Sequence, residues 1–239
     1  MPEERLTKKE LRAFKKQQQR ESSQLEKRNQ GLKKAIIWIV VVAVVIVVIS
    51  LMASNDDKPV AGTDEITKTD HIKGSATAGV TLLEYSDFQC PACAFYKPMV
   101  AQLTAEYGDQ IAFIYRHFPL RQIHPNADEA AYAAEAAGYQ SKFWEMHDLL
   151  FDEQNLWSKE SNPTDIFITY AERLQLDMEQ FRNDYNSSKV KEKVDADLYS
   201  GRRAGVNGTP TFFLNGEKFD NPRSYQDLKQ LIDGALSRQ

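Results

Sequence analysis

Two cysteines, Cys90 and Cys93, are the residues of this sequence best suited to do chemistry. They enclose Pro91 and Ala92, and they are the only cysteines among the 239 residues. A pair with this spacing can bind a metal ion, form a structural disulfide, or cycle between a dithiol and a disulfide. The residues around the pair decide among these three uses.

Two of these uses fit the sequence poorly. A zinc site would need two further ligands, and the candidates are His71, His117, His124 and His147, none of which form a closely spaced pair. A purely structural disulfide across this spacing would close a very short loop, which gains little entropy and tends to be strained. Redox chemistry is therefore favoured, with the cysteine pair itself as the redox group and no other cofactor or metal.

Pro91 predicts that the cysteines lie at the start of a helix, because proline is favoured in the first helical turn. Apolar residues recur at four-residue intervals from Phe95 to Tyr107, as expected for such a helix. The unpaired N–H groups and the dipole at a helix start favour a thiolate, so we expect a lowered pKa at Cys90. A substrate thiolate would attack Cys90, Cys93 would depart, and a second substrate cysteine would then displace Cys90.

Glu84 interrupts the apolar run VTLLEY at residues 80–85, which otherwise predicts a short buried strand. A carboxylate in such a run is costly unless it is neutralised or solvated. One alternative is a strand residue that faces outward. The other is a buried acid with a raised pKa that accepts a proton from Cys93 and returns it.

The elements that would position these residues combine strands with helices. We expect strands at 80–85 and 111–115 on either side of the cysteine helix, and then an alanine-rich helical region. Its helices are predicted near residues 126–138, 142–152, 164–174, 178–185 and 187–203. A hairpin with strands at 211–214 and 217–219 around Asn215-Gly216, and a helix at about 224–236, complete the domain. This order predicts an α/β, thioredoxin-like fold with a helical insertion at about residues 120–203.

The N-terminal part of the chain has a different composition. Residues 1–34 carry eleven Lys and Arg against five Asp and Glu, although the whole chain has a net charge of −4. Residues 35–53 carry no charge and are long enough to cross a hydrocarbon core of about 30 Å as a helix. A cleaved signal peptide would have a shorter basic segment and a shorter apolar run. We therefore predict one uncleaved transmembrane anchor at 35–53.

The charges beside this segment predict its orientation. Lys33 and Lys34 abut its N-terminal end, so the positive-inside rule places the basic tail at 1–34 in the cytoplasm. Residues 54–69 are polar and read as a linker, and residues 70–239 would form the folded domain outside the cytoplasm. Compartments outside the cytoplasm are oxidising, so disulfides can form and persist there. The acidic outer part has no basic patch with interleaved aromatic residues, so nucleic-acid binding is not expected.

Several strings of the sequence resemble the DsbA-like thiol-disulfide oxidoreductases, particularly their membrane-anchored or lipid-anchored bacterial members. The strings are EYSDFQCPAC, FIYRHFPL, HPNADEAAYAAEAAG, KFWEMHDLLF and VNGTPTFFLNG, and the resemblance covers about residues 70–237. It implies a thioredoxin fold with a nucleophilic Cys90 and a resolving Cys93. It also matches Glu84 to the family's buried acid.

The resemblance further implies that Thr209-Pro210 is the family's cis-proline loop and lies against the cysteines. Pro210 has no N–H, and the Thr209 backbone could pair with an extended substrate segment. Thr209 and Pro210, together with Pro91 and Ala92, are therefore the expected substrate-binding residues. An ordinary proline that begins a strand is the alternative.

Ala92 departs from the most oxidising members of the family, which have a histidine at this position. Its side chain supplies neither a hydrogen bond nor a positive charge, so we expect a reduction potential less extreme than about −120 mV. The expected function is the introduction of disulfides into unfolded or reduced exported proteins. The resemblance implies reoxidation by a quinone-linked membrane partner of the DsbB or vitamin-K-epoxide-reductase type. A reductase or isomerase of the same fold, and a redox-inactive chaperone-like binding domain, remain alternatives.

The remaining candidates are interpreted as structural. His117 and His124 fall within family-like strings, but a histidine satisfied by its surroundings is the more common case. Phe143, Trp144 and Trp157 lie at helical spacing in the predicted insertion. They are expected to line the core or a groove.

Overall fold

The computed structural model describes Trp38 and residues 65–238. Apart from Trp38, the predicted transmembrane anchor at 35–53 lies outside the described residues, as do the basic tail at 1–34 and the linker up to residue 64. Within the described part of the chain, no helix combines the length and the apolar character needed to cross a membrane. The anchor and its orientation therefore stay predictions.

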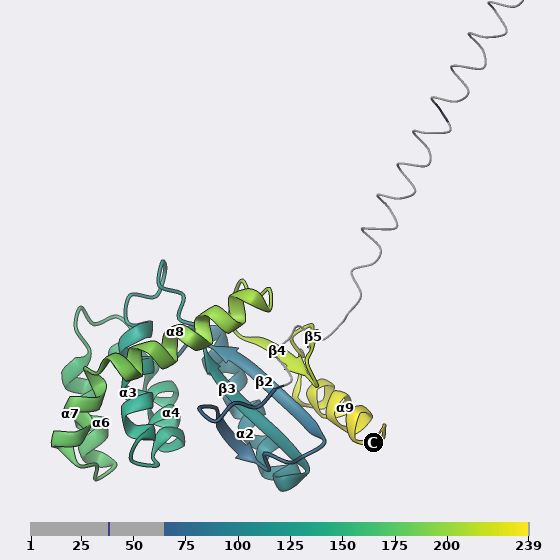
Figure 1. Ribbon diagram of the computed structural model, residues 1–239, viewed down its shortest axis with the longest axis horizontal. Helices are drawn as coiled ribbons and strands as arrows, with labels where there is room; N and C mark the ends of the chain where they lie inside the picture. Colours follow the sequence, from purple (N-terminus) through teal and green to yellow (C-terminus); the bar gives the residue numbers. More distant parts are fainter. Residues whose placement is uncertain (1–37, 39–64, 239) are drawn as a thin grey trace, which may run out of the picture. The chain divides into compact units, whose positions relative to one another are not determined.

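A five-stranded sheet forms the centre of the folded domain (Figure 1). Its strands are β1 (His71–Gly74), β2 (Val80–Ser86), β3 (Ile111–His117), β4 (Thr211–Leu214) and β5 (Glu217–Phe219), in the order β1-β3-β2-β4-β5. The β2 and β3 strands pair in parallel, and all other neighbours are antiparallel. The strand that leads into the cysteines therefore lies in the middle of the sheet.

Helix α2 (Pro91–Tyr107) connects β2 to β3 and begins directly after Cys90, as Pro91 predicts. A short 3-10 turn at Gly108–Gln110 then leads into β3. A parallel pair of strands needs such a crossover, because a tight hairpin cannot join their ends. The predicted strand-helix-strand unit is confirmed.

A block of helices is inserted between β3 and β4, and Figure 1 shows most of it gathered to one side of the sheet. The helices are α3 (Ala127–Gly138), α4 (Phe143–Asp152), α5 (Gln154–Trp157), α6 (Thr164–Arg173), α7 (Met178–Tyr185) and α8 (Ser188–Arg203). Five of the six agree with the predicted ranges to within one residue. Helix α5 and the edge strand β1 were not predicted. Helix α9 (Tyr225–Leu236) follows the hairpin, as expected.

The hairpin between β4 and β5 turns at Asn215 and Gly216, which have φ angles of 50° and 82°. Both angles lie in the left-handed region, where asparagine and glycine are the residues best tolerated. The Asn215-Gly216 pair is therefore the reason that this turn could be predicted.

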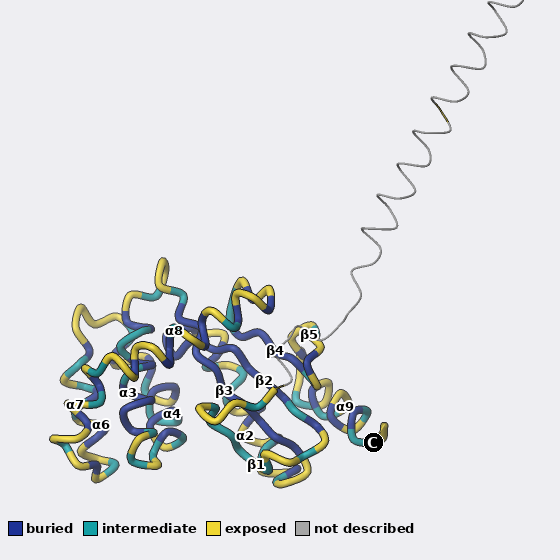
Figure 2. Tube along the Cα trace, in the orientation of Figure 1, coloured by how far each residue is buried: buried dark blue, intermediate teal, exposed yellow. Residues whose placement is uncertain are grey.

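The sheet is covered on both faces, so β2 and β3 are buried along most of their length (Figure 2). Val80 and Leu82 of β2 belong to the larger core cluster, which includes apolar residues of α2 and α9. Leu83 and Tyr85 belong to a second cluster that includes Leu198 of α8. Because side chains alternate along a strand, Glu84 lies on the same side of β2 as Leu82, which is the α2 side.

Of the three aromatic residues expected to line the core or a groove, Phe143 and Trp157 are buried, and Trp144 is partly buried. Trp157 is fully buried, and its indole N–H donates to the Leu150 carbonyl over 2.9 Å. Phe143 is buried as well, and its ring stacks on that of His71 in β1. Through this stacking, the helical insertion contacts the sheet directly.

Candidate redox site

The two cysteines occupy different depths at the start of α2. Cys90 is the N-cap residue with an extended backbone, and its N–H donates to the Asp87 carbonyl over 3.0 Å. Both cysteines are free thiols; Cys90 is 6% exposed and Cys93 only 1%. The intervening Pro91 and Ala92 are exposed at the surface. Cys90 is therefore the sulfur nearer to an incoming substrate, and Cys93 is the deeper partner.

The surroundings of Cys90 favour a thiolate. A hydrogen bond from the Cys93 thiol is the main cause that lowers the pKa of Cys90 to about 5, against the opposing effect of burial. Thr209 and the backbone N–H groups of Cys93 and Ala92 lower the pKa further. The backbone of Ala92 thus helps the thiolate even though its side chain cannot. The expected lowering at a helix start is supported, although the neighbouring thiol contributes more than the backbone.

Cys93 shows the opposite behaviour. Burial raises the pKa of its thiol well above the usual range, and the hydrogen bond to Cys90 and the negative charge of Glu84 raise it further. In the dithiol form the proton therefore stays on Cys93 while Cys90 ionises. This division of charge is the one that the exchange mechanism requires.

Glu84 is buried in the centre of the sheet, 4% exposed, which excludes the outward-facing alternative. Its register partners are Tyr115 of β3 and Phe212 of β4. Burial raises the pKa of the Glu84 carboxyl to about 7; the nearby Ser86 hydroxyl acts against this, and the charge of Cys90 adds to it. A carboxyl in this position changes its protonation near neutral pH.

Two hydroxyl groups lie near both of these ionisable residues and were not anticipated from the sequence. Ser86 and Tyr115 each interact electrostatically with both Glu84 and Cys93. Their oxygens are buried, and within the described residues neither has a hydrogen-bond partner of good geometry. Buried hydroxyls without a fixed partner can still donate to, or accept from, groups that change charge beside them.

The loop at Thr209-Pro210 lies against the cysteines, and its peptide bond is cis, as the resemblance implied. The Cys90 thiol donates to the Thr209 carbonyl over 3.4 Å, while the Thr209 hydroxyl is buried without a partner in the described structure. When Cys90 ionises it can no longer donate, but the Thr209 hydroxyl can donate to it. Thr209 therefore acts on Cys90 as well as being an expected substrate contact.

The turn before Cys90 is tied to the helical insertion by two glutamines. The Gln154 side chain of α5 donates to the Phe88 carbonyl over 2.7 Å and to the Cys90 carbonyl over 3.1 Å. The Gln89 side chain donates to the Ser158 carbonyl and accepts from the Asn126 N–H. The insertion thereby fixes the backbone that presents Cys90, which explains why α5 matters despite its short length.

The histidines have carboxylate partners in different parts of the domain. His71 and His117 both hydrogen-bond Glu135 through Nε2, over 2.9 Å and 2.8 Å. His147 hydrogen-bonds Asp148, and His124 hydrogen-bonds Asp87. The expectation of a structural role fits His117. His124 is different, because Asp87 lies in the turn that carries Cys90, and both residues fall in strings that the family resemblance singled out.

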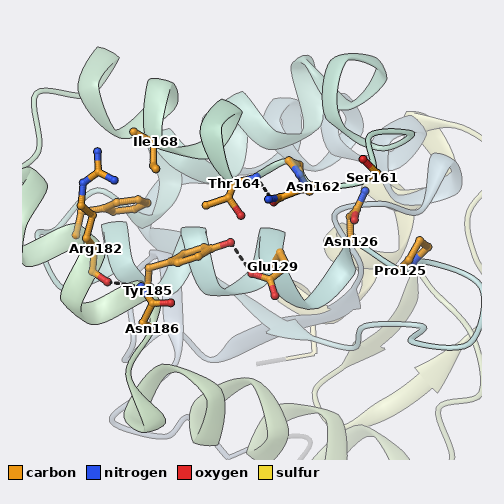
Figure 3. Close-up of a pocket in the computed structure, with 12 residues that line it drawn as sticks. Pro125, Asn126, Glu129, Ser161, Asn162, Thr164, Ile168, Arg182, Tyr185 and Asn186 are labelled. Carbon is orange, nitrogen blue, oxygen red and sulfur yellow. Dashed lines mark hydrogen bonds between the residues drawn. The ribbon is translucent and has the colours of Figure 1, made fainter.

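A cavity of about 420 Å³ lies within the helical insertion (Figure 3), and neither cysteine is among the residues that line it. Its walls come from α3, α6, α7 and the segment before α6, and they include Glu129, Arg182 and Tyr185. The Tyr185 hydroxyl donates to Glu129 across one wall, as the dashed line in Figure 3 shows. The redox site is thus a surface turn beside the sheet and is not contained in this cavity.

Comparison with known proteins agrees with this geometry. The family described as Thioredoxin matches residues 66–234. The chain is 39% identical over 168 residues to the Na(+)/H(+) antiporter NhaA 3 of Salinispora tropica, and 40% identical over 170 residues to NhaA 1 of Mycolicibacterium vanbaalenii. These matches cover 70% of this chain and 25% and 26% of those proteins. The chain therefore spans about a quarter of the length of these curated relatives.

Solved structures show the same fold. Wolbachia pipientis alpha-DsbA1 superposes with a TM-score of 0.66 at 19% identity, covering 74% of this chain and 96% of that one. Oxidised BdbD from Bacillus subtilis gives 0.62 at 22% identity, covering 71% and 94%. A periplasmic thioredoxin-like protein from Salmonella enterica serovar Typhimurium gives 0.61 at 18%, covering 74% and 96%. The chain therefore belongs to the thioredoxin family, and its fold is that of these DsbA-like structures.

Proposed function

We propose that this protein is an extracytoplasmic disulfide oxidase that introduces disulfides into reduced exported proteins through Cys90 and Cys93. The observation that carries the proposal is the contrast between the two thiols, whose pKa values are shifted in opposite directions. A stabilised Cys90 thiolate favours the reduced form of the pair and makes its disulfide a better oxidant. Oxidase activity is therefore favoured over the reductase and isomerase alternatives.

The proposed reaction begins when a substrate thiolate attacks Cys90 in the Cys90-Cys93 disulfide. Cys93 leaves, and Glu84 supplies the proton that this buried sulfur requires. A second substrate thiolate then attacks the substrate sulfur of the mixed disulfide and displaces Cys90 as a thiolate. The pKa of about 7 at Glu84 suits this exchange of a proton near neutral pH.

The proposed substrate contacts surround Cys90 at the surface. The Thr209 backbone would pair with an extended substrate segment, beside Pro210. Pro91 and Ala92 are exposed, and Phe95, one turn further along α2, is 63% exposed. An apolar rim of this kind suits unfolded chains, which still expose their apolar residues.

The proposed location is the outer face of a membrane, with residues 35–53 as the anchor and the N-terminus in the cytoplasm. The apolar length of this segment supports a membrane span, and the lysines before it support the orientation of that span. The antiporter relatives are named for membrane transport and contain a domain homologous to this one. Their names support a location of the present domain beside a membrane. A quinone-linked membrane protein of the DsbB or vitamin-K-epoxide-reductase type would reoxidise Cys90 and Cys93.

A redox titration tests the direction of electron flow. The purified full-length protein is equilibrated with glutathione buffers, and the fraction with oxidised Cys90 and Cys93 is measured after acid quenching and thiol alkylation. We expect a potential between about −120 and −200 mV, since Ala92 supplies no charge to the thiolate. A value near about −270 mV would contradict the oxidase and support a reductase.

A further inference from the structure

The stabilisation of Cys90 described so far comes from neutral groups. The Cys93 thiol, Thr209 and two backbone N–H groups all act as hydrogen-bond donors or dipoles. Ala92 occupies the position from which a histidine would supply a positive charge. If the site contains a positive charge that stabilises the Cys90 thiolate, that charge must therefore come from another segment of the chain.

Asp87 is a fully buried carboxylate three residues before Cys90. Its Oδ1 accepts from the Gln89 N–H over 2.7 Å. Its Oδ2 accepts from the Leu120 N–H over 2.8 Å and forms a hydrogen bond of 2.7 Å with Nδ1 of His124. A carboxylate, which can only accept, can take all three of these hydrogen bonds when Nδ1 of His124 carries a proton. A buried carboxylate of this kind favours the charged form of the imidazole that it holds.

The loop that carries His124 is fastened to the Cys90 turn at both of its ends. Leu120 is bound through its N–H to Asp87, and Asn126 is bound through its N–H to the Gln89 side chain over 2.7 Å. His124 lies between these two attachments and is itself bound to Asp87. The ring is thereby held against the turn that presents Cys90, with 14% of its side chain exposed.

We infer that the Asp87–His124 pair supplies the positive charge that Ala92 does not, and that it makes the Cys90-Cys93 disulfide a stronger oxidant. His124 would act as a positioning residue that stabilises the Cys90 thiolate through space. This inference rests on the proposed function and deepens it. It assigns part of the oxidising strength to a loop outside the cysteine motif.

The electrostatics around His124 support this assignment. A hydrogen bond with Asp87 raises the pKa of His124, burial opposes it, and the charges of Asp87 and Cys90 raise it further. Asp87 and Cys90 are therefore the charged groups that face the ring. Arg121, the other cation of this loop, is bound by Asp128 and Asp195 instead.

The redox reaction changes the charge beside His124. A substrate dithiol gives two electrons to the Cys90-Cys93 disulfide, so this S–S bond breaks and one forms in the substrate. Cys90 is released as a thiolate and Cys93 as a thiol. Glu84 passes its proton to Cys93 and regains one from the substrate dithiol, whose other proton goes to solvent. The negative charge exists only in the reduced form, and an imidazolium beside it therefore stabilises that form alone.

The test is the variant His124→Asn in the full-length protein, since asparagine can still donate to Asp87 but carries no charge. The first measurement is the ultraviolet absorbance of the Cys90 thiolate as a function of pH. We expect its midpoint to rise by roughly half to one pH unit. The second is the glutathione equilibrium constant for reduction, which should fall about three- to tenfold at about pH 6; a tenfold change equals about 30 mV.

The pH dependence separates a charge effect from a structural one. The wild type and His124→Asn should converge at about pH 9, where the imidazole is neutral. An equal difference at both pH values, or an unchanged thiolate midpoint, would overturn the inference. Arg121→Gln removes a cation from the same loop and should leave both measurements unchanged.

Two controls keep the outcomes distinct. The far-ultraviolet circular dichroism of His124→Asn should match that of the wild type, and His124→Gln serves as a second neutral variant. If the wild type fails to exchange with glutathione, the proposed function fails. The thiolate titration still tests the role of His124 in that case.

Discussion

Glu84 and Glu135 are buried to the same extent, each 4% exposed, yet their pKa values are shifted in opposite directions. Burial alone disfavours the ionised form of both carboxyl groups. Whatever distinguishes them must therefore come from the groups that each one contacts. The comparison separates a buried charge that holds the fold together from one that can take part in chemistry.

Glu135 of α3 is held between two histidines of the sheet. His71 of β1 and His117 of β3 bind the same carboxylate oxygen. Burial acts to raise the pKa of Glu135, but the hydrogen bonds and charges of these histidines outweigh it and hold the pKa well below its usual range. The three residues fasten the helical insertion to the sheet, and the carboxylate stays ionised throughout the neutral range.

Glu84 has neighbours of another kind. Burial raises its pKa to about 7; Ser86 opposes this only in part, and the charge of Cys90 reinforces it. The carboxyl group thus lies near hydroxyls and thiols, which do not fix its charge. The partners of a buried acid, rather than its depth, therefore indicate whether it is structural or reactive.

The first prediction concerns the pH dependence of stability, where the two glutamates should act in opposite senses. The pKa of Glu84 is about 7 in the folded protein and about 4.3 in an unfolded chain. The folded state therefore binds this proton more tightly, so the contribution of Glu84 to stability should fall as the pH rises from about 4.3 to 7, while the lowered pKa of Cys90 contributes in the opposite direction. This separation corresponds to about 4 kcal/mol for the reduced protein. Urea unfolding at a series of pH values measures it.

The variant Glu84→Gln should remove this loss. The contribution of Glu135 has the opposite sign, because its pKa is lowered on folding. Its stabilisation is present above about pH 4.3 and is lost as the pH falls below that value. Glu84→Gln should keep this acid-side loss. Identical profiles for Glu84→Gln and the wild type between about pH 4.3 and 7 would refute the distinction.

The second prediction compares the two acids at one pH. Glu135→Gln should lower the free energy of unfolding at about pH 7.5 by about 2 to 3 kcal/mol, because the charged hydrogen bonds to His71 and His117 are lost. Glu84→Gln should instead raise the stability of the reduced protein, since a poorly compensated charge is removed. Urea midpoints and slopes give both values. A loss of stability in Glu84→Gln comparable to that in Glu135→Gln would show that both acids are structural.

The sequence predicted the parts of the site whose signals are local. Pro91 marked the start of α2 and hence the position of Cys90 at a helix N-terminus. The apolar strand around Glu84 was recognised, but two alternatives stayed open because alternation along a strand does not say which face the cysteine helix covers. Only the packing of α2 against β2 decides this. The edge strand at His71–Gly74 was missed because four residues carry little periodicity.

The contacts between distant segments could not be predicted from one sequence. Glu135 and His71 are 64 positions apart, and His124 and Asp87 are 37 apart. Each pair forms because the insertion packs on the sheet in one particular way, which local patterns do not specify. For the same reason the role of Ser86 could not be assigned. Its position near Glu84 and Cys93 follows from the fold, whereas a serine at the end of a strand is unremarkable by itself.

The third prediction tests whether the uncompensated charge of Glu84 is used in the reaction. Glu84→Gln should slow the oxidation of a dithiol peptide by about tenfold to thirtyfold at about pH 7, because Cys93 loses its proton donor and water must replace it. Stopped-flow kinetics at several pH values measure the rate.

The control is Glu145→Gln, which changes an exposed glutamate paired with Lys142 and should leave the rate unaltered. The deficit should be small in acid, where solvent protons are plentiful, and should grow up to about pH 7, above which wild-type Glu84 loses the proton that it donates. A rate equal to that of the wild type across this range would leave Glu84 as a buried acid without a role in exchange, and its contrast with Glu135 would then be one of stability alone.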